Sequence, residues 1–265
     1  MSSPSLPEAN GAAQQPRKLN YPSYQWVAKT RKEKLNPGLV TYYKKPLYVT
    51  QGSMQWLWDD QGQRYLDLFG GIVTVSVGHC HPKVNEALKA QVDTLWHTTS
   101  IYMHPKIHEY AEKLTATLPE PLKCVYFVNS GSEANDMAMM MAREYTGNFD
   151  IVSFRNSYHG ASPYTNGLTA HSSWKFNFAN SFGIHHAMNP DPYKGLFGGA
   201  HCRDSPVQTQ RQCSCEQGQC QASEGYLNQF DEIFKYSLPK DGKVAAFFAE
   251  SIQVKNKNLS IKEVA

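Results

Sequence analysis

The sequence predicts an α/β fold: a mostly parallel sheet with helices on both faces, preceded by a small antiparallel β segment. Two patterns in the 265 residues support this prediction. In residues 81–253, short apolar runs alternate with helical or irregular connections, which is typical of parallel sheets covered by helices. In residues 36–80, short β-like runs are separated by turn residues, which is typical of antiparallel strands.

The antiparallel segment is expected to be a meander. Its β-like runs are residues 47–50, 54–58 and 64–68, and the connections between them contain Gly52 and Gly62. Because each connection is short and contains a glycine, neighbouring runs should pair as hairpins.

Two amphipathic helices are predicted after Pro82. Apolar residues recur with helical spacing in two sets: Val84, Ala87, Leu88, Val92 and Leu95, then Ile107, Tyr110, Ala111, Leu114 and Leu118. The second helix should end before Pro119, which cannot continue it. Apolar runs at residues 125–128, 151–154 and 244–249 then predict buried strands of the parallel sheet.

The loop after the run at residues 125–128 carries the most informative motif. Ser130 and Glu133 have the spacing of a capping box, and apolar residues recur with helical spacing after them. A helix that begins here directs its unpaired N–H groups and positive dipole end at the loop, where phosphate binds readily. Gly131 would let the backbone approach an anion closely, and Ser132 could add a hydroxyl donor. A capped helix that binds no ligand is the alternative.

Four motifs follow one another along the chain: Gly78-His79-Cys80-His81-Pro82, Asn129-Ser130-Gly131-Ser132-Glu133-Ala134-Asn135, Ser157-Tyr158-His159-Gly160 and Ala249-Glu250-Ser251-Ile252-Gln253. In this order they resemble the class III, pyridoxal-phosphate-dependent aminotransferases. The resemblance runs from about residue 40 to Gln253, and residues 96–98 and 201–209 are similar to the alanine–glyoxylate branch of that family. It implies that residues 81–253 form an incomplete large domain of the aminotransferase fold type I.

The resemblance also implies a site for the cofactor pyridoxal 5'-phosphate. Its cofactor-binding residues would be Ser130, Gly131 and Ser132 for the phosphate, Tyr158 and His159 for the ring, and Glu250 for the pyridine side. Because ligands of open α/β sheets sit beyond the carboxyl ends of strands, these residues should converge on one crevice. The alternatives are that Tyr158 packs in a core, that His159 is a hydrogen-bonded structural residue and that Glu250 is a surface or ion-paired carboxylate. The family proline after Glu250 is replaced here by Ser251.

The implied activity is transfer of an amino group from an amino acid, such as alanine, to a 2-oxo acid, such as glyoxylate. The partners would be these small molecules and further copies of the chain, in a homodimer or homotetramer. Neither nucleic acid nor membrane is expected as a partner, because the formal net charge is only +3 and no apolar run has the length to span a bilayer. The alternative is a non-catalytic fragment that binds phosphate or a partner subunit.

No catalytic residue is predicted within the chain. The family's aspartate, in a D-E-V-x-x-G segment, and its catalytic lysine have no counterpart here, so we expect a chain that is truncated before them and inactive. Residues 254–265 match nothing in the family. Because Val254-Lys255 must be encoded as GTNAAR, a common splice-donor sequence, we interpret this tail as retained intron, and a genuine short isoform is the alternative.

Two further segments have compositions of their own. Residues 1–35 are expected to form a disordered tail, since the first twenty or so are rich in Ser, Pro, Ala and Gln, and they lack the apolar stretch of a secretory signal. The resemblance implies a mitochondrial location, but a presequence would be richer in arginine and free of Glu8, so a cytoplasmic location stays open.

The second segment is a Cys-rich insertion, residues 200–222, containing Cys202, Cys213, Cys215 and Cys220. The spacing of these cysteines fits no common zinc pattern, so no metal site is assigned, and reduced thiols or an opportunistic disulfide are favoured over a structural metal.

Overall fold

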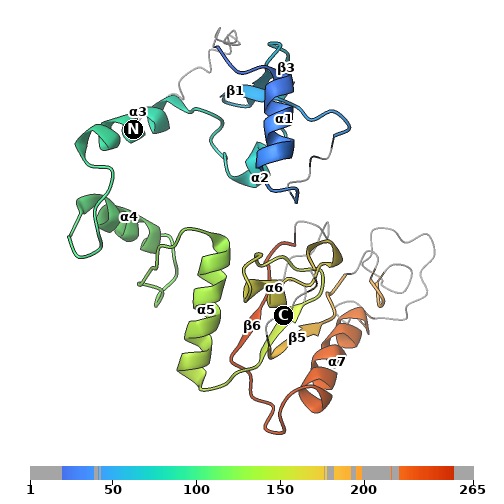
Figure 1. Cartoon of the computed structure of the whole chain (residues 1–265). Coiled ribbons are helices and arrows are strands. Elements are labelled where there is room, and N and C mark those ends of the chain that lie inside the picture. Colours follow the sequence, from blue (N-terminus) through green and yellow to red (C-terminus); the bar gives the residue numbers. More distant parts are fainter. Residues whose placement is uncertain are drawn as a thin grey trace. The chain divides into compact units, whose positions relative to one another are not determined.

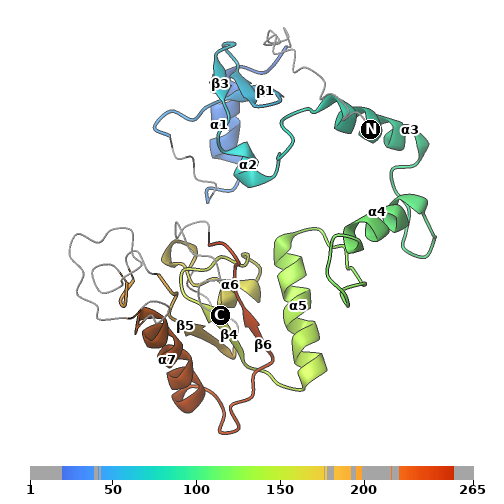
Figure 2. The ribbon, with the colours of Figure 1, turned by 180° about the vertical axis from the view of Figure 1, so that it is seen from behind.

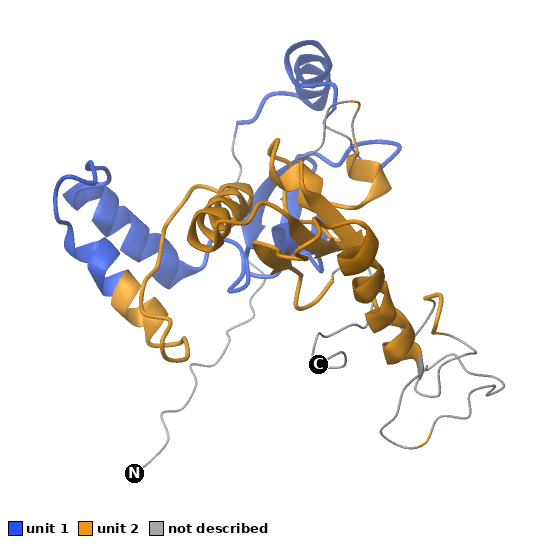
Figure 3. Cartoon of the chain, turned by 90° about the horizontal axis from the view of Figure 1, so that it is seen from below, with its two compact units in different colours: residues 1–110 blue, residues 111–265 orange. Residues whose placement is uncertain are grey.

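The computed structural model describes residues 20–38, 41, 43–175, 177, 182–191, 195–198, 216 and 221–253. The predicted tail at residues 254–265 and all four cysteines of the Cys-rich insertion lie outside the described residues. The chain forms two compact units, residues 1–110 and 111–265 (Figure 3). The predicted domain boundaries, at residues 36, 81 and 254, stay predictions.

The first unit contains the predicted antiparallel meander (Figure 1). Strands β1 (Val49–Ser53), β2 (Trp56–Asp59) and β3 (Arg64–Leu66) pair in that order, each antiparallel to its neighbour. Trp58 in the central strand is buried. The meander is therefore confirmed, with strand bounds that differ by a few residues from the predicted runs.

Helices α1 (Tyr24–Lys34), α2 (Gly70–Val73) and α3 (Pro82–Thr94) also belong to the first unit, and α4 (Pro105–Thr115) runs from it into the second. Helices α3 and α4 confirm the two predicted amphipathic helices. Helix α1 shows that the prediction of a disordered tail over residues 1–35 is wrong for residues 24–34. The reason is a capped start: the Ser23 hydroxyl accepts a hydrogen bond from the Trp26 N–H at 3.2 Å. Three basic residues in the last turn, Arg31, Lys32 and Lys34, stabilise the helix further, because their positive charges lie at the negative end of the helix dipole.

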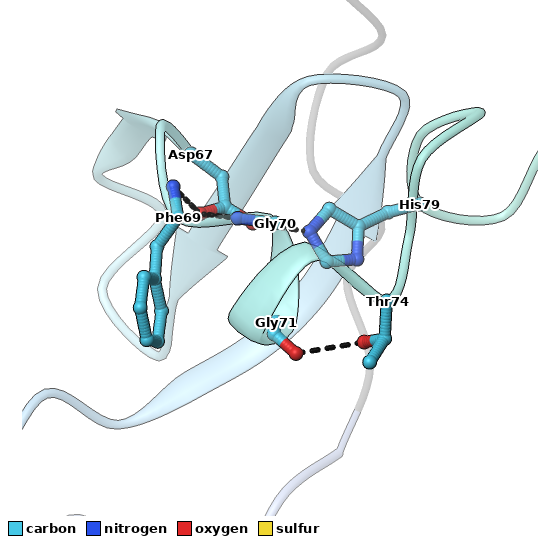
Figure 4. Close-up of polar contacts among 6 residues, drawn as sticks. All are labelled: Asp67, Phe69, Gly70, Gly71, Thr74 and His79. Carbon is cyan, nitrogen blue, oxygen red and sulfur yellow. Dashed lines mark hydrogen bonds and ion pairs between the residues drawn. The ribbon is translucent and has the colours of Figure 1, made fainter. Parts of the chain in front are cut away.

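The loop that leads from β3 to α3 is held by its own polar groups (Figure 4). One oxygen of Asp67 accepts from the N–H groups of Phe69 and Gly70, both at 2.9 Å, and the other lies 2.6 Å from His79 Nε2. The hydrogen bond with His79 lowers the pKa of the Asp67 carboxyl below its ordinary value. Ile72 and Val73 have φ values of 59° and 55°, which are strained for β-branched residues. Such strain persists only where the surrounding bonds hold it.

The second unit is built on a parallel sheet (Figures 1 and 2). Strand β4 (Ile151–Phe154) lies at the centre, between β5 (Ile184–Ala187) and β6 (Ala246–Phe248). Both neighbours are parallel to β4, and Ile151 is level with Ile184 on one side and with Ala246 on the other.

Helices cover both faces of this sheet. On one face, Ile151 packs with Met139 of α5 (Gly131–Thr146) and Leu168 of the short helix α6 (Thr165–Leu168). On the other face, Phe154 packs with Phe230 of α7 (Gln221–Tyr236). Because both faces are covered, every residue of β4 is buried, as expected of a central parallel strand. The predicted α/β class, a mostly parallel sheet with helices on both faces and a small antiparallel segment before it, is confirmed.

The prediction of a strand at residues 125–128 is wrong. These residues form neither helix nor strand, and Tyr126 and Phe127 are exposed. A strand forms only where its backbone groups pair with a neighbouring strand. Residues 125–128 pair with no strand in the described part of the chain, so their apolar character alone does not make them a strand.

Strand β5 and helix α7 are among the elements of the second unit that had no prediction. Strand β5 reads Ile-His-His-Ala, which has no alternation of apolar and polar residues. Helix α7 begins within the predicted Cys-rich insertion, although Tyr226, Phe230 and Ile233 have the spacing of one helix face. Among the described residues, no helix has the combination of length and apolar character needed to cross a membrane.

The core of the second unit provides a test of this fold. Met139 is 2% exposed against Ile151 and Leu168, whereas Met140, the next residue of α5, is 58% exposed. We expect Met139→Ala to lower the free energy of unfolding by about 2–5 kcal/mol, because it leaves a cavity in the core. The matched control Met140→Ala should change it by less than about 0.5 kcal/mol. Urea denaturation of both variants measures this, and equal losses would contradict the described packing.

Candidate functional site

The start of helix α5 has the geometry that its sequence predicted. The Ser130 hydroxyl accepts from the Glu133 N–H at 3.1 Å, and the Glu133 carboxylate accepts from the Asn129 N–H at 2.7 Å. These two bonds cap the helix, although Glu133 binds the residue before the N-cap and not Ser130 itself, as it would in a standard capping box. The N–H groups of Gly131 and Ser132 make no hydrogen bond within the described part of the chain, as is usual in a first helical turn. They are donors at the positive end of the helix dipole, which suits an anion.

The surface beside Gly131 is open. Outside the adjacent residues and the backbone of its own helix, a Cβ atom added at this glycine would meet no atom within 4 Å. The glycine is therefore not needed for packing, and its backbone does not adopt a positive φ. An anion could approach the first turn of α5 closely because no side chain is present here.

The loop after β4 packs directly on this first turn. We call residues 158–162 the aromatic loop. Gly160, with φ 126°, lies so close to α5 that a Cβ atom there would clash with Ser132 and Thr165. The Ala161 N–H donates to the Ser132 hydroxyl at 3.3 Å, so that hydroxyl still has its own proton to donate to a ligand.

Tyr158 and Glu250 are brought together at the carboxyl end of the sheet. The Tyr158 N–H donates to Glu250 Oε2 at 3.3 Å, although 92 residues separate them in sequence. The centroids of the Tyr158 and Trp174 rings are 5.4 Å apart, and the ring planes are tilted by 58°. Tyr158 is 42% exposed. The structure therefore presents a partly open aromatic ring beside a carboxyl group. Burial raises the pKa of Glu250, and the hydrogen bond from Tyr158 partly offsets this.

His159 is placed differently from its neighbour. It is 7% exposed, with its N–H donating to the Thr169 hydroxyl at 2.9 Å and its C=O accepting from Asn135 Nδ2 at 2.8 Å. Its Nε2 atom is buried without a hydrogen-bond partner in the described part of the chain. Burial, and then the nearby His186, lower the pKa of His159 to about 4. Its ring is thus buried and neutral at neutral pH, and its contact with the cofactor stays a prediction.

Sequence reasoning missed two residues that hold this site. Trp174 belongs to a short 3-10 helix (Ser172–Trp174) whose position beside Tyr158 no motif indicated. Asn135 lies within a recognised motif, but its bond to His159 spans 24 residues and depends on tertiary packing. No local signal identifies either role.

The buried imidazole makes stability depend on pH. The pKa of His159 is about 4 when folded and about 6.5 when unfolded, so between these values only the unfolded chain binds the proton. The free energy of unfolding should therefore fall as the pH drops from about 6.5, by about 3 kcal/mol at pH 4.

Urea denaturation at pH 7 and pH 4.5 checks this. His159→Gln should reduce the loss between the two pH values, because it removes the titrating group. The exposed His108, changed to Gln, should leave the loss unchanged. Identical losses in both variants and the original chain would show that His159 is not the responsible group.

Comparisons with known proteins agree with this architecture. Residues 40–255 match the family described as Aminotransferase class-III. The chain is 52% identical over 238 residues to human mitochondrial alanine–glyoxylate aminotransferase 2, covering 90% of this chain and 46% of that protein. It is 41% identical over 232 residues to the mitochondrial alanine–glyoxylate aminotransferase 2 homolog 2 of Arabidopsis thaliana, covering 88% and 43%. The chain therefore spans about half the length of the curated relatives it matches.

Solved structures show the same fold. An (S)-enantioselective omega-transaminase from Thermomicrobium roseum superposes with a TM-score of 0.72 at 24% identity, covering 89% of this chain and 51% of that one. An amine transaminase from an uncultivated Pseudomonas species, in its PLP-bound form, gives a TM-score of 0.67 at 26% identity, covering 83% and 49%. The partial fold type I architecture is thus confirmed. With most of its length matched by the family, the chain belongs to the class-III aminotransferases.

Proposed function

We propose that this chain forms the cofactor-binding portion of an aminotransferase that moves an amino group from an amino acid such as alanine to a 2-oxo acid such as glyoxylate. The observation that carries the proposal is the convergence of three segments on one edge of the parallel sheet. They contribute the start of α5, the ring of Tyr158 and the carboxyl group of Glu250. The 52% identity to alanine–glyoxylate aminotransferase 2 supports the choice of substrates.

Pyridoxal 5'-phosphate fits the groups that are present. Its phosphate would bind to the N–H groups of Gly131 and Ser132, with the hydroxyl of Ser132 and the capping Ser130 beside them. The open space at Gly131, which a Cβ atom would fill, accommodates the anion. Tyr158 would lie against the ring, and Glu250 would steady its pyridine side. When bound, this cofactor supplies an electron sink for the α-carbon of the amino acid.

The residues of this chain would bind and orient the cofactor. The dipole of α5 favours the dianionic phosphate, which fixes one end of the molecule. Tyr158, fixed by Glu250 and Trp174, would set the plane of the other end and exclude water from one face of the ring. His159, the buried residue of the aromatic loop, would support Tyr158 without a charge of its own at neutral pH.

Assembly and location complete the proposal. We propose a homodimer or homotetramer, because the first unit exposes large apolar residues, including Phe69, Ile72, Val73 and Trp96, that association would cover. We propose a mitochondrial location because the relatives from human and Arabidopsis thaliana carry mitochondrial in their names. The substrates are small molecules, and the proposal includes neither nucleic acid nor membrane.

Gly131 allows a test of cofactor binding that is separate from stability. Because α-helical Cβ atoms tilt toward the helix start, Gly131→Ala would place a methyl group where the anion approaches. No protein atom obstructs that methyl group, and alanine favours helix by up to about 1 kcal/mol over glycine. We therefore expect an unchanged or higher melting temperature, together with at least about tenfold weaker binding of pyridoxamine phosphate, a difference of about 1.4 kcal/mol.

The matched control is Gly147→Ala at the other end of α5. Gly147 has φ 66° as the C-cap, so alanine there should lower stability by about 1 kcal/mol and leave ligand affinity unchanged. Calorimetric titration and thermal denaturation measure both quantities. Equal affinity in Gly131→Ala and the original chain would remove the start of α5 from the proposed site.

The activity itself is tested with a chimera. We propose that the chain alone is inactive, because none of its segments matches those that carry the family's catalytic lysine and aspartate. The chain alone should form no pyruvate from alanine and glyoxylate. Residues 1–253 joined to the remaining half of the human relative should form pyruvate, as measured by a coupled assay. A soluble chimera that binds the cofactor without any amino transfer would contradict the proposed reaction and favour a non-catalytic binding role.

A further inference from the structure

We propose that Asn135 is a positioning residue that fixes the first turn of α5 to the aromatic loop, so that the phosphate end and the ring end of the cofactor site keep one spacing. Asn135 lies on the second turn of α5, beyond the residues proposed to contact phosphate. It would act through His159, whose backbone it binds. This inference rests on the function proposed above.

Three hydrogen bonds join α5 to the aromatic loop. Asn135 Nδ2 donates to the His159 C=O at 2.8 Å. The Ser162 hydroxyl donates to Asp136 Oδ1 at 2.7 Å, and the Ala161 N–H donates to the Ser132 hydroxyl at 3.3 Å. The three partners on the helix lie within its first two turns, and the three partners on the loop lie within four consecutive residues. The bonds therefore fix the loop to the helix.

The bond from Asn135 is the one that controls Tyr158 most directly. Its acceptor is the backbone C=O of His159, the residue that follows Tyr158 in the chain. The N–H of His159 donates to the Thr169 hydroxyl at 2.9 Å. The two other bonds end farther along the loop. The Ser162 hydroxyl is also shared with Thr165, at 2.6 Å. The bonds with Thr169 and Glu250 attach this stretch to other elements, and the bond from Asn135 ties the backbone next to Tyr158 to α5.

A fixed spacing matters only for a ligand that uses both ends of the site. Pyridoxamine phosphate would contact the start of α5 with its phosphate and Tyr158 with its ring, so it gains affinity from preorganisation. Inorganic phosphate would contact only the start of α5. Loss of the Asn135 bond should therefore weaken the first ligand and leave the second nearly unchanged.

The experiment compares these two probes on the full chain by calorimetric titration. Pyridoxamine phosphate is chosen because it has no aldehyde to react with surface lysines. For Asn135→Ala we expect the Kd of pyridoxamine phosphate to rise about tenfold, the size expected for one lost hydrogen bond, and the Kd of phosphate to change less than about twofold. Asn135→Asp, which keeps the shape but replaces the donor with an acceptor facing a carbonyl, should weaken pyridoxamine phosphate at least as much.

Asn148→Ala is the matched control. Asn148 is also half-buried and its Nδ2 also donates to a backbone carbonyl, that of Val244 at 3.5 Å, just beyond the opposite end of α5. It should change neither affinity. Equal losses of both ligands in Asn135→Ala would indicate general damage to the fold and would overturn the positioning role, as would unchanged affinity for pyridoxamine phosphate.

Hydrogen exchange separates this inference from the proposed function. Asn135→Ala should speed amide exchange in residues 158–162 without changing exchange in β4, and Asn148→Ala should not have this effect. If the original chain binds neither probe, the proposed function fails and the exchange rates alone decide. Faster exchange confined to the aromatic loop would then support the link between Asn135 and the loop, and unchanged exchange would overturn it.

Discussion

The close approach of the aromatic loop to the first two turns of α5 is the constraint on which the site depends. Gly160 makes it possible, since a side chain at φ 126° would be strained and would collide with Ser132. The hydrogen bond from Asn135 to the His159 C=O and the one from the Ser162 hydroxyl to Asp136 then keep the loop in place. Without this contact, an anion-binding helix start and an aromatic ring would be two separate features.

The parallel sheet determines where these features meet. Strand β4 is buried on both faces, so its ends are fixed by the cores that α5, α6 and α7 form on either side. The aromatic loop follows β4, and Glu250 follows β6, its parallel neighbour. Parallel strands bring their carboxyl ends to one edge, which places Tyr158 within hydrogen-bond distance of Glu250.

The site also contains a buried polar layer that a purely structural core would avoid. His159 Nε2 and Asn166 Oδ1 are buried without hydrogen-bond partners in the described part of the chain. An unpaired buried polar atom reduces stability by about 1–3 kcal/mol. Departures of this kind from good packing are concentrated at functional sites. The first unit has such an atom too, His81 Nδ1. Its motif neighbour His79 has a structural explanation, because it binds Asp67 and pairs with Met54 in a β bridge.

The sequence by itself determined the local features. The meander, helices α3 and α4, strand β4 and the capped start of α5 depend on neighbouring residues, and so their patterns predicted them. Tertiary structure decided the rest. The run at residues 125–128 is no strand because it pairs with no strand in the described part of the chain. The residues of β5 form a strand because they pair with β4, although two of them are histidines. Likewise, the bonds of Asn135 to His159 and of Tyr158 to Glu250 join residues far apart in the chain, and only packing brings such groups together.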